Sequence, residues 1–420
     1  MGKDLGLLCL TVVLPLGFNS VALAQSSDGA PYELSGTSIS GTSNPAQRIM
    51  TAPVGPGGAL KFENGLHLYP SVSTNIGYND NLLSDNSNSL KSSYTDLAST
   101  VVGELKHKGD RYTALASINA RRYIESAADN INDSQLVVAA DNYYSARARS
   151  GLALGLVNSS DARGSNNRPV TAEVARWHST NFNGTFIYGA PEAPGRVEFD
   201  VGNQDKVYDN ERAITAVGDV DTGSYAGRVF YRLGTRSLAL AEFRDAKANY
   251  GSSPIDSNIE RRYYVGLTWE ATAATTGIVK IGQMTKDFDQ GGRQGYSGGS
   301  WEATVRWLPL TYSAVDFQAS RTTADATGFG NYNLVTNTSI IWNHKWNQSL
   351  GSRLMVGLMD TEFGGTPRQD SAVNFGIKVD YAIRRWLKVG VDFARTDNTS
   401  NYAAYEYKRN IAMLTLEATL

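Results

Sequence analysis

One short motif in the sequence has the form required for covalent chemistry. Residues 295–299, GYSGG, match G-x-S-x-G, the turn that exposes a nucleophilic serine in α/β-hydrolases. That chemistry requires a strand before the serine and a helix after it, and no helical periodicity follows Gly299. The sequence also gives no means of placing a histidine beside Ser297. We therefore predict that the protein is not an enzyme and has no catalytic residues.

The sequence also has few residues that could bind a metal ion. The chain has four histidines and one cysteine, and no two histidines have the H-x-x-x-H spacing of a helical zinc site. Asp219 and Asp221 resemble half of a calcium-binding loop, but the bidentate acid that closes such a loop is missing. We predict no metal and no cofactor. The net charge of -2 gives no electrostatic reason to expect nucleic acid as a partner.

The N-terminus has the pattern of an export signal. In residues 1–24 an apolar stretch from Leu5 to Leu16 precedes the sequence ALA, which forms an A-x-A cleavage site. The single cysteine, Cys9, lies inside this signal peptide, so disulfides are not expected in the mature chain. Residues 25–64 are rich in Ser, Gly, Thr and Pro and have no periodicity. We predict a flexible periplasmic segment there, and keep docking element and lumen plug as hypotheses for its role.

Alternating hydrophobicity begins near residue 65 and continues to residue 420. In Val373 to Tyr381, for example, every second residue is apolar. The chain is 41% hydrophobic and 10% aromatic, and its 19% of charged residues is low against about 25% in soluble proteins. No apolar run near 20 residues follows the signal peptide, which excludes a helical membrane protein. These features predict an all-β domain over residues 65–420.

The connections between the alternating runs distinguish among all-β folds. We count 18 runs, joined by eight short turns that alternate with nine longer polar loops; one of the short turns is expected at residues 149–151. A meander of this kind is typical of a transmembrane antiparallel up-and-down β-barrel of the bacterial outer membrane. The predicted location is therefore the Gram-negative outer membrane. The chain is too short for a plug domain with 22 strands, which excludes a TonB-type transporter.

The polar face of such strands lines the lumen. Both signs of charge occur there in similar numbers, so these side chains either pair across strands or offer weak contacts to sugar hydroxyls and acidic substituents. The strand containing residues 237–244 does not show which face is apolar. The predicted lumen-lining residues are Arg121, Glu198, Asp200, Arg228, Arg232, Arg244, Arg262, Glu270, Lys280, Glu302, Arg306, Asp316, Lys378, Asp380, Lys388 and Asp392.

Two further patterns concern lipid and assembly. Aromatic residues near strand ends are predicted to form girdles at the lipid interfaces. The last strand is apolar at every second position, like the terminal signal read by the outer-membrane barrel assembly machinery, so that machinery and outer-membrane lipid are expected partners. The girdle candidates are Tyr78, Tyr94, Trp269, Trp301, Trp307, Trp342, Tyr381 and Trp386, and the assembly-signal candidates are Ala412, Leu414, Leu416, Ala418 and Leu420.

Residues 69–83, YPSVSTNIGYNDNLL, resemble the opening strand of a family of β-barrel porins found in capsule and exopolysaccharide loci. Similar spacing follows along essentially the whole barrel, including residues 152–167, 275–289 and 308–332. The family consists of outer-membrane barrels, several of them associated with passing polysaccharide to the cell surface. Their partner is a periplasmic polysaccharide-export protein without an outer-membrane span. The resemblance implies the same cargo and partner here, and no catalytic residues.

Two alternatives to a polysaccharide conduit stay open. The first is a general or solute-specific diffusion porin, although no connection is clearly long enough for the infolded loop that usually narrows such a pore. The second is a structural or adhesive barrel that acts through its Asn-, Ser- and Gly-rich surface loops. The conduit differs from both in requiring a polymer on its periplasmic side.

Overall fold

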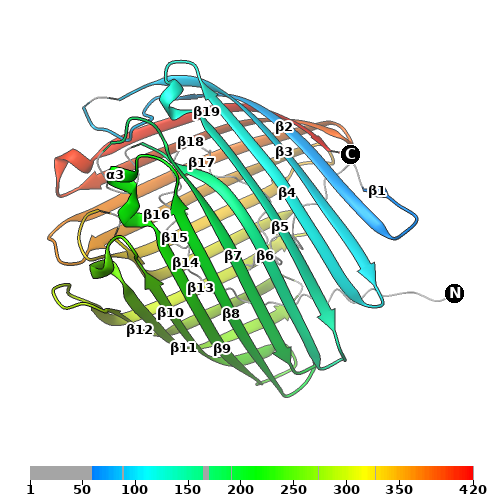
Figure 1. Cartoon of the computed structure of the whole chain (residues 1–420). Coiled ribbons are helices and arrows are strands. Elements are labelled where there is room, and N and C mark those ends of the chain that lie inside the picture. The colour runs from blue at the N-terminus through cyan, green and yellow to red at the C-terminus, as the bar shows by residue number, and fades with distance from the viewer. Residues whose placement is uncertain are drawn as a thin grey trace.

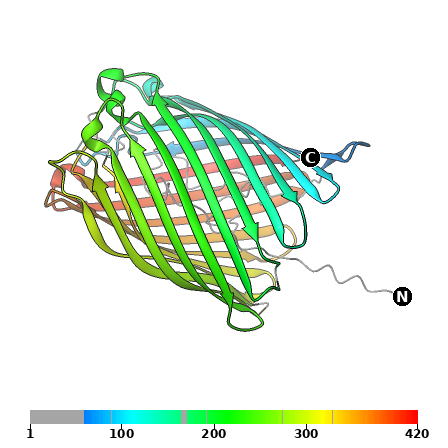
Figure 2. The ribbon, with the colours of Figure 1, turned by 60° about the horizontal axis from the view of Figure 1, so that its bottom comes forward.

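The fold is a single closed antiparallel sheet. In the computed structural model, eighteen long strands, β2 to β19, pair each with the next, and β19 pairs with β2 to close the ring. Figures 1 and 2 show the resulting barrel. The prediction of an all-β, up-and-down barrel of about 18 strands is confirmed. The structure describes residues 59–420 except 88, 164–169, 191, 273, 327 and 420, and the side chains of 270–272 are also outside the description.

The predicted N-terminal parts are described only at their end. Residues 1–24 and the segment 25–58 lie outside the described residues. Within the remainder of the predicted segment, the two residues of β1 (Leu60–Lys61) pair with Leu68 and His67 of β2. β1 uses the edge of β2 that β19 leaves open, because the pairing of β19 with β2 ends at Ser71.

Each long strand has 13 to 16 residues, enough to cross a bilayer at a tilt and extend beyond it. The strands are β2 (Leu66–Asn79), β3 (Ser92–His107), β4 (Asp110–Tyr123), β5 (Ile131–Tyr143), β6 (Ala148–Asp161), β7 (Ala175–Tyr188), β8 (Gly195–Tyr208), β9 (Val220–Arg232), β10 (Ser237–Asn249), β11 (Asn258–Thr272), β12 (Thr275–Phe288), β13 (Tyr296–Leu310), β14 (Ser313–Asp325), β15 (Tyr332–Lys345), β16 (Leu350–Phe363), β17 (Gln369–Arg384), β18 (Leu387–Ser400) and β19 (Tyr407–Thr419).

The connections divide the barrel into two unlike ends. Eight connections of two to six residues lie at one end, here called the short-turn end, and nine of five to thirteen residues lie at the other, the long-loop end. Figure 2 shows the C-terminus at the short-turn end, on the right. The long connections hold the short helices α3 (Arg212–Thr215), η1 (Ala127–Asp129), η3 (Ala216–Gly218), η4 (Pro254–Asp256) and η5 (Ala403–Tyr405). None of the helices in the described part of the chain has the length and hydrophobicity needed to span a bilayer.

One predicted turn is in the wrong place. Residues 149–151 belong to β6, and the turn before that strand consists of residues 144–147. The Oγ atom of Ser145 accepts hydrogen bonds from the backbone N–H groups of Arg147, at 3.2 Å, and Ala148, at 3.1 Å. A serine that binds the backbone in this way stabilises a turn without a glycine, so the glycine at 151 was a misleading signal.

The outer surface of the barrel is an apolar band. Ile281 of β12 and Val391 of β18 are each about 60% exposed, and five alternate residues of β17 from Val373 to Tyr381 are exposed as well. β19 pairs with β2 over residues 71–79 and closes the ring, so the backbone polar groups of the strands pair within the sheet. Exposed apolar area of this extent marks a surface that contacts lipid.

Aromatic residues concentrate on this outer face near the short-turn end. Trp307, Tyr381 and Trp386 are about half exposed there, and Trp269 and Trp342 lie at the same ends of β11 and β15. Such rings suit the boundary between hydrocarbon and headgroups. Tyr78 is exposed at the long-loop end of β2, whereas Trp301 lies further along the outer face of β13, with the Arg321 guanidinium 5.3 Å from its ring centroid.

Tyr94 departs from the girdle prediction. It is fully buried on the inner face of β3, where its ring packs against Tyr123 at 5.4 Å between centroids and against the Arg121 guanidinium at 4.7 Å. The cause is its position two residues from Asp96, which places both side chains on the lumen side of the strand. Proximity to a strand end does not decide which face a residue occupies.

The last strand presents its apolar residues to the outside. Ala412, Leu414 and Leu416 are exposed, and Ala418 is partly buried on the same face. Leu420 lies outside the described residues. Recognition of this strand by the outer-membrane barrel assembly machinery stays a prediction.

A charge placed on the outer face should destabilise the barrel more than one placed inside. We predict that Ile281→Lys lowers the free energy of unfolding by about 2 to 4 kcal/mol, because Ile281 lies at mid-strand where lipid would surround the ammonium group. Ser117→Lys, on the inner face of β4, is the matched control and should cost less than about 1 kcal/mol. Urea unfolding of the barrel in lipid vesicles, followed by tryptophan fluorescence, measures both. Equal losses would contradict the assignment of the two faces.

Candidate functional site

Charged side chains on the inner face of β8 to β10 alternate in sign from strand to strand. The register places Arg228 of β9 directly opposite Glu198 of β8 on one side and Glu242 of β10 on the other. Their neighbours Phe199 and Val229 are about half exposed on the outer face. The period of two therefore directs the three charges into the lumen, where each cation has a carboxylate on an adjacent strand.

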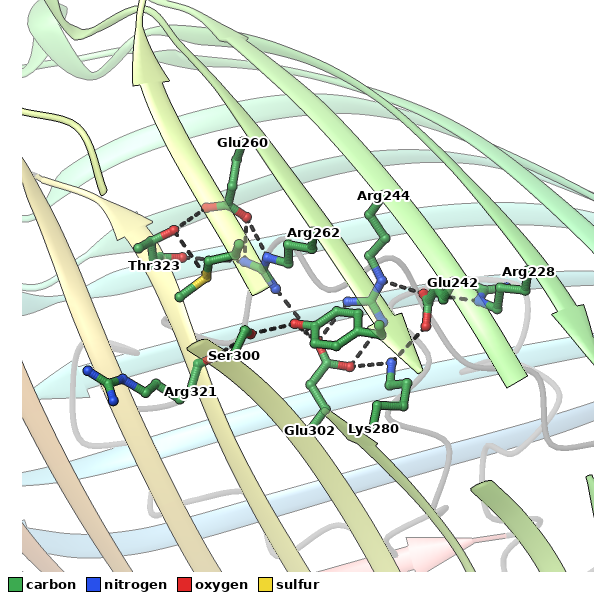
Figure 3. Close-up of polar contacts among 12 residues, drawn as sticks. Arg228, Glu242, Arg244, Glu260, Arg262, Lys280, Ser300, Glu302, Arg321 and Thr323 are labelled. Carbon is green, nitrogen blue, oxygen red and sulfur yellow. Dashed lines mark hydrogen bonds and ion pairs between the residues drawn. The ribbon is translucent and has the colours of Figure 1, made fainter. Parts of the chain in front are cut away.

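Glu242 is the centre of this arrangement. Its Oε1 accepts from Nε of Arg228 at 3.1 Å and from Nε of Arg244, and its Oε2 lies 3.0 Å from Nζ of Lys280. Figure 3 shows the three cations converging on this carboxylate. All four side chains are at most 3% exposed. A buried carboxylate surrounded by three cations thus connects the adjacent strands β9 and β10 with β12.

Glu302 of β13 is a second centre. Nη1 and Nη2 of Arg244 donate to its two oxygens at 2.8 and 2.9 Å, a bidentate pair. Lys280 also contacts Glu302, and the hydroxyl of Tyr264 donates to it at 3.3 Å. Because Arg244 and Lys280 contact both Glu242 and Glu302, the two centres form one connected network.

The network extends toward both ends of the barrel. Near the long-loop end, Glu260 contacts Arg262 and Lys286, and Nζ of Lys286 lies 2.5 Å from Asp325. Near the short-turn end, Nε of Arg196 lies 2.9 Å from Glu198, and Nη2 of Arg228 lies 2.6 Å from Asp200. The ion pairs therefore run along one side of the lumen for most of its length.

We call this set the ionic wall. It has six acidic and six basic residues, so its formal charges cancel. Burial of an ion is tolerated when it is paired in this way, and the pairing leaves little net field in the pore. The ionic wall consists of Arg196, Glu198, Asp200, Arg228, Glu242, Arg244, Glu260, Arg262, Lys280, Lys286, Glu302 and Asp325.

An aromatic ring and a glycine complete the centre of the wall. The ring centroid of Tyr264 lies 5.0 Å from Nζ of Lys280 and 5.3 Å from the Arg244 guanidinium, and its hydroxyl is 2.6 Å from Oγ of Ser300. Gly282 lies between Tyr264 and Ser300 in the sheet register. A Cβ atom on Gly282 would come within 1.7 Å of the Tyr263 carbonyl oxygen, so only glycine fits this close approach.

The short-turn side of the same inner face is apolar. Phe230, Leu240 and Ile278 form a buried cluster, and the Arg196 guanidinium lies 4.3 Å from the Phe230 ring centroid. Leucines at 238 and 240 thus share a face with Glu242, which is why the alternation in this strand was ambiguous. Inward-facing apolar residues obscured the signal that would have identified Glu242.

The structure places seven predicted lumen residues in the ionic wall and distributes the rest. Arg306 and Asp316 form a bidentate pair at 2.7 and 2.9 Å, and Arg121 donates to Asp96 at 2.8 Å. Arg232 donates to backbone carbonyls of short turns. The seven are Glu198, Asp200, Arg228, Arg244, Arg262, Lys280 and Glu302.

The remaining predicted residues lie on β17, β18 and β11. Nζ of Lys378 lies 3.5 Å from Asp380 and 3.8 Å from Asp392. Lys388 lies 3.5 Å from Glu417. The side chain of Glu270 is outside the description. Sequence reasoning did not name Arg196, Glu242, Glu260, Lys286 and Asp325, although the first four share a strand face with residues that were named.

The sequence motifs for other chemistry have no supporting geometry. Ser297 is exposed near the start of β13, and the strand continues for thirteen further residues to Leu310, so no helix follows this serine. The strand-turn-helix context of a nucleophile elbow is therefore missing at this serine. In the part of the chain that is described, no group of three or more His, Cys, Asp or Glu residues could hold a metal ion.

Loss of the central carboxylate should destabilise the wall. We predict that Glu242→Gln lowers the free energy of unfolding by about 3 to 5 kcal/mol, because three buried cations lose a shared counter-charge. Glu417→Gln is the control: its pair with Lys388 is about one-third exposed, and its loss should cost at most about 1 kcal/mol. Urea unfolding of both variants in vesicles tests this. A loss at Glu242 no larger than at Glu417 would show that the network does not brace the barrel.

Solved structures with similar folds are outer-membrane barrels. OccK3 (OpdO) of Pseudomonas aeruginosa is 11% identical, with a TM-score of 0.46 over 84% of this chain and 95% of that one. A bacterial polysaccharide outer membrane secretin is 9% identical, with a TM-score of 0.38 over 86% and 100%. The FrpB iron transporter of Neisseria meningitidis is 9% identical, with a TM-score of 0.45; the match covers 79% of this chain and 62% of FrpB.

Sequence comparison identifies the family. No curated protein matches the chain. One family model, described as "Putative beta-barrel porin 2", matches residues 65–420, which include all eighteen strands of the barrel. The protein is thus an outer-membrane β-barrel of porin type, and the chain belongs to the Putative beta-barrel porin 2 family.

Proposed function

We propose that this barrel is an outer-membrane conduit through which exopolysaccharide or capsular polysaccharide reaches the cell surface. In this proposal the short-turn end faces the periplasm and the long loops face the medium, the usual orientation of such barrels. The observation that carries the proposal is a closed barrel whose buried lumen charges satisfy one another. A hydrated polymer can pass such a wall without being held by unpaired ions.

The mechanism is passive. The barrel supplies a mainly polar lumen shielded from lipid by the apolar band, and the polymer advances as it is delivered from the periplasmic side. Contacts must be numerous enough to keep the polymer in the pore and weak enough to release it. The ionic wall meets this condition because a sugar hydroxyl would have to displace an existing ion pair to bind strongly.

The short-turn end offers a surface for a periplasmic partner. The described residues of the eight short connections include four basic residues, Lys108, Arg147, Arg236 and Arg385, and one acidic residue, Glu192. A polysaccharide-export protein with an acidic rim would be attracted to this end. β1, the described end of the N-terminal segment, pairs with the short-turn end of β2, and we propose that residues 25–64 act at this end as a docking element or a lumen plug.

Deletion of the gene in its own host tests the proposal. We expect loss of surface polysaccharide with polymer retained in the periplasm, and restoration of surface display by the intact gene. The measurement is the amount of polymer on intact cells and in periplasmic extracts, with the level of the periplasmic export protein as the control for indirect effects.

Unchanged surface polymer in the deletion strain would contradict the conduit. It would favour a diffusion porin, for which the conductance of the purified barrel in planar bilayers is the next measurement. Neither outcome of the deletion experiment affects the description of the barrel fold or of the side chains in its lumen.

A further inference from the structure

The inner face of β2 to β5 differs in chemistry from the ionic wall. Asp96 and Asp133 lie on this face opposite Asn75 and Asn119; from there toward the short-turn end the face presents mid-strand hydroxyl and amide side chains with no formal charge, each at least partly exposed. Their strand neighbours Ile76, Val101 and Leu136 are exposed on the outer face, which fixes the inward direction of this set. We call it the amide-hydroxyl wall, and it consists of Ser73, Asn75, Thr100, Ser117, Asn119 and Gln135.

The sheet register makes this set contiguous. Ser117 of β4 lies directly opposite Thr100 of β3 and Gln135 of β5. Asn119 is two residues along the same face of β4 as Ser117, and Ser73 and Asn75 occupy the corresponding face of β2. Side chains this close offer neighbouring donors and acceptors along one track rather than isolated polar points.

The side chains of this wall are not bound to one another or to other described residues. Oδ1 of Asn75 and Oδ1 of Asn119 are buried, but the hydroxyls of Ser73 and Ser117, the two amide nitrogens and the exposed amide of Gln135 donate no hydrogen bond to another described residue. In the ionic wall, by contrast, the carboxylates of Glu242 and Glu302 are occupied by several cations each. Capacity to bind a passing molecule therefore lies on the amide-hydroxyl wall.

The two walls face each other across the lumen. In a closed ring of eighteen strands, β11 is nine strands from β2, β12 from β3 and β13 from β4. The long side chains of Arg262, Lys280 and Glu302 thus project from the side opposite the amide-hydroxyl wall. The serines, asparagines and threonine opposite them are shorter and fill less of the lumen.

We infer that the amide-hydroxyl wall is the sugar-contacting track of the pore and that it selects a neutral, hydroxyl-rich chain. The inference rests on the proposed function and specifies its cargo. Amides and hydroxyls both donate and accept, as sugar hydroxyls do, so each contact can be made and broken without a change of charge. The neighbouring cation, Arg121, is paired with Asp96 at 2.8 Å.

The long-loop mouth also disfavours an acidic chain. Among the described residues of the nine long connections, eleven are acidic and five are basic. A polyanion leaving the barrel would meet this excess of negative charge, whereas a neutral chain would not. Both observations point to the same class of cargo.

Planar-bilayer recordings of the purified full-length barrel test the inference. The probes are maltohexaose, a neutral linear oligosaccharide, and hexagalacturonate, an acidic one of equal length, each at about 0.15 M salt to limit surface electrostatics. We expect maltohexaose to interrupt the current and to bind more tightly than hexagalacturonate. Absence of maltohexaose binding, or tighter binding of hexagalacturonate, would overturn the inference.

A variant identifies the track. In Asn75→Ala/Asn119→Ala/Gln135→Ala the dissociation constant for maltohexaose should rise about tenfold, since several weak hydrogen bonds are lost together. Asn337→Ala, on the inner face of β15, is the matched control and should bind like wild type. The retained gel shift on heating shows that each variant is folded. An unchanged constant in the folded triple variant, or an equal rise in Asn337→Ala, would overturn the assignment.

The outcome is separable from that of the deletion experiment. Trapped polymer in the deletion strain together with no maltohexaose binding would keep the conduit and reject the track. Unchanged surface polymer together with Asn-dependent maltohexaose binding would reject the conduit and keep a neutral-saccharide track in a diffusion porin.

Discussion

The pairing of β19 with β2 is the interaction on which the rest of the structure depends. A sheet with an apolar outer face in lipid cannot leave a row of unpaired N–H and C=O groups at an edge, because no water is present to bind them. Nine residue pairs, from Ser71 opposite Thr419 to Asn79 opposite Ile411, remove that edge. Once the ring is closed, every strand has one face toward lipid and one toward the lumen. Successive residues of a strand alternate between these two faces, so the position of a residue along its strand decides which environment its side chain meets.

Closure also determines what the lumen can contain. Eighteen strands enclose more space than short side chains fill, so polar and charged groups can occupy the inner face with water. On β8 to β14 this face carries long side chains that pair with one another, and the sign of charge alternates across Glu198, Arg228 and Glu242. The resulting network braces one side of the pore, because its charged side chains form ion pairs with one another across the strands.

The opposite side of the pore has the complementary property. Ser117, Asn119 and Gln135 are uncharged, and their side chains form no hydrogen bond with another described residue. In the conduit that we propose, this division of the lumen into a braced side and an uncharged polar side would let one barrel resist collapse and still offer weak contacts to cargo. It follows from a difference in side-chain length and charge between two sectors of the same sheet.

The sequence by itself determined the strands and their meander, since a period of two and alternating turn lengths are local properties of the chain. The eighteen runs correspond to β2 to β19, although the turn expected at 149–151 lies at 144–147 because Ser145, not a glycine, stabilises it. The alternation of apolar and polar residues also predicted that Arg228 and Lys280 face the lumen. The sequence did not reveal that Glu242 joins them, because Leu240 faces the same side, nor that Tyr94 packs inside against Arg121. Those facts depend on partners on other strands, which lie one strand away for Tyr94 and Arg121, and three strands and 58 residues away for Arg244 and Glu302. Only the closed tertiary structure brings such residues together, because register and closure, not local pattern, decide which inward side chains meet.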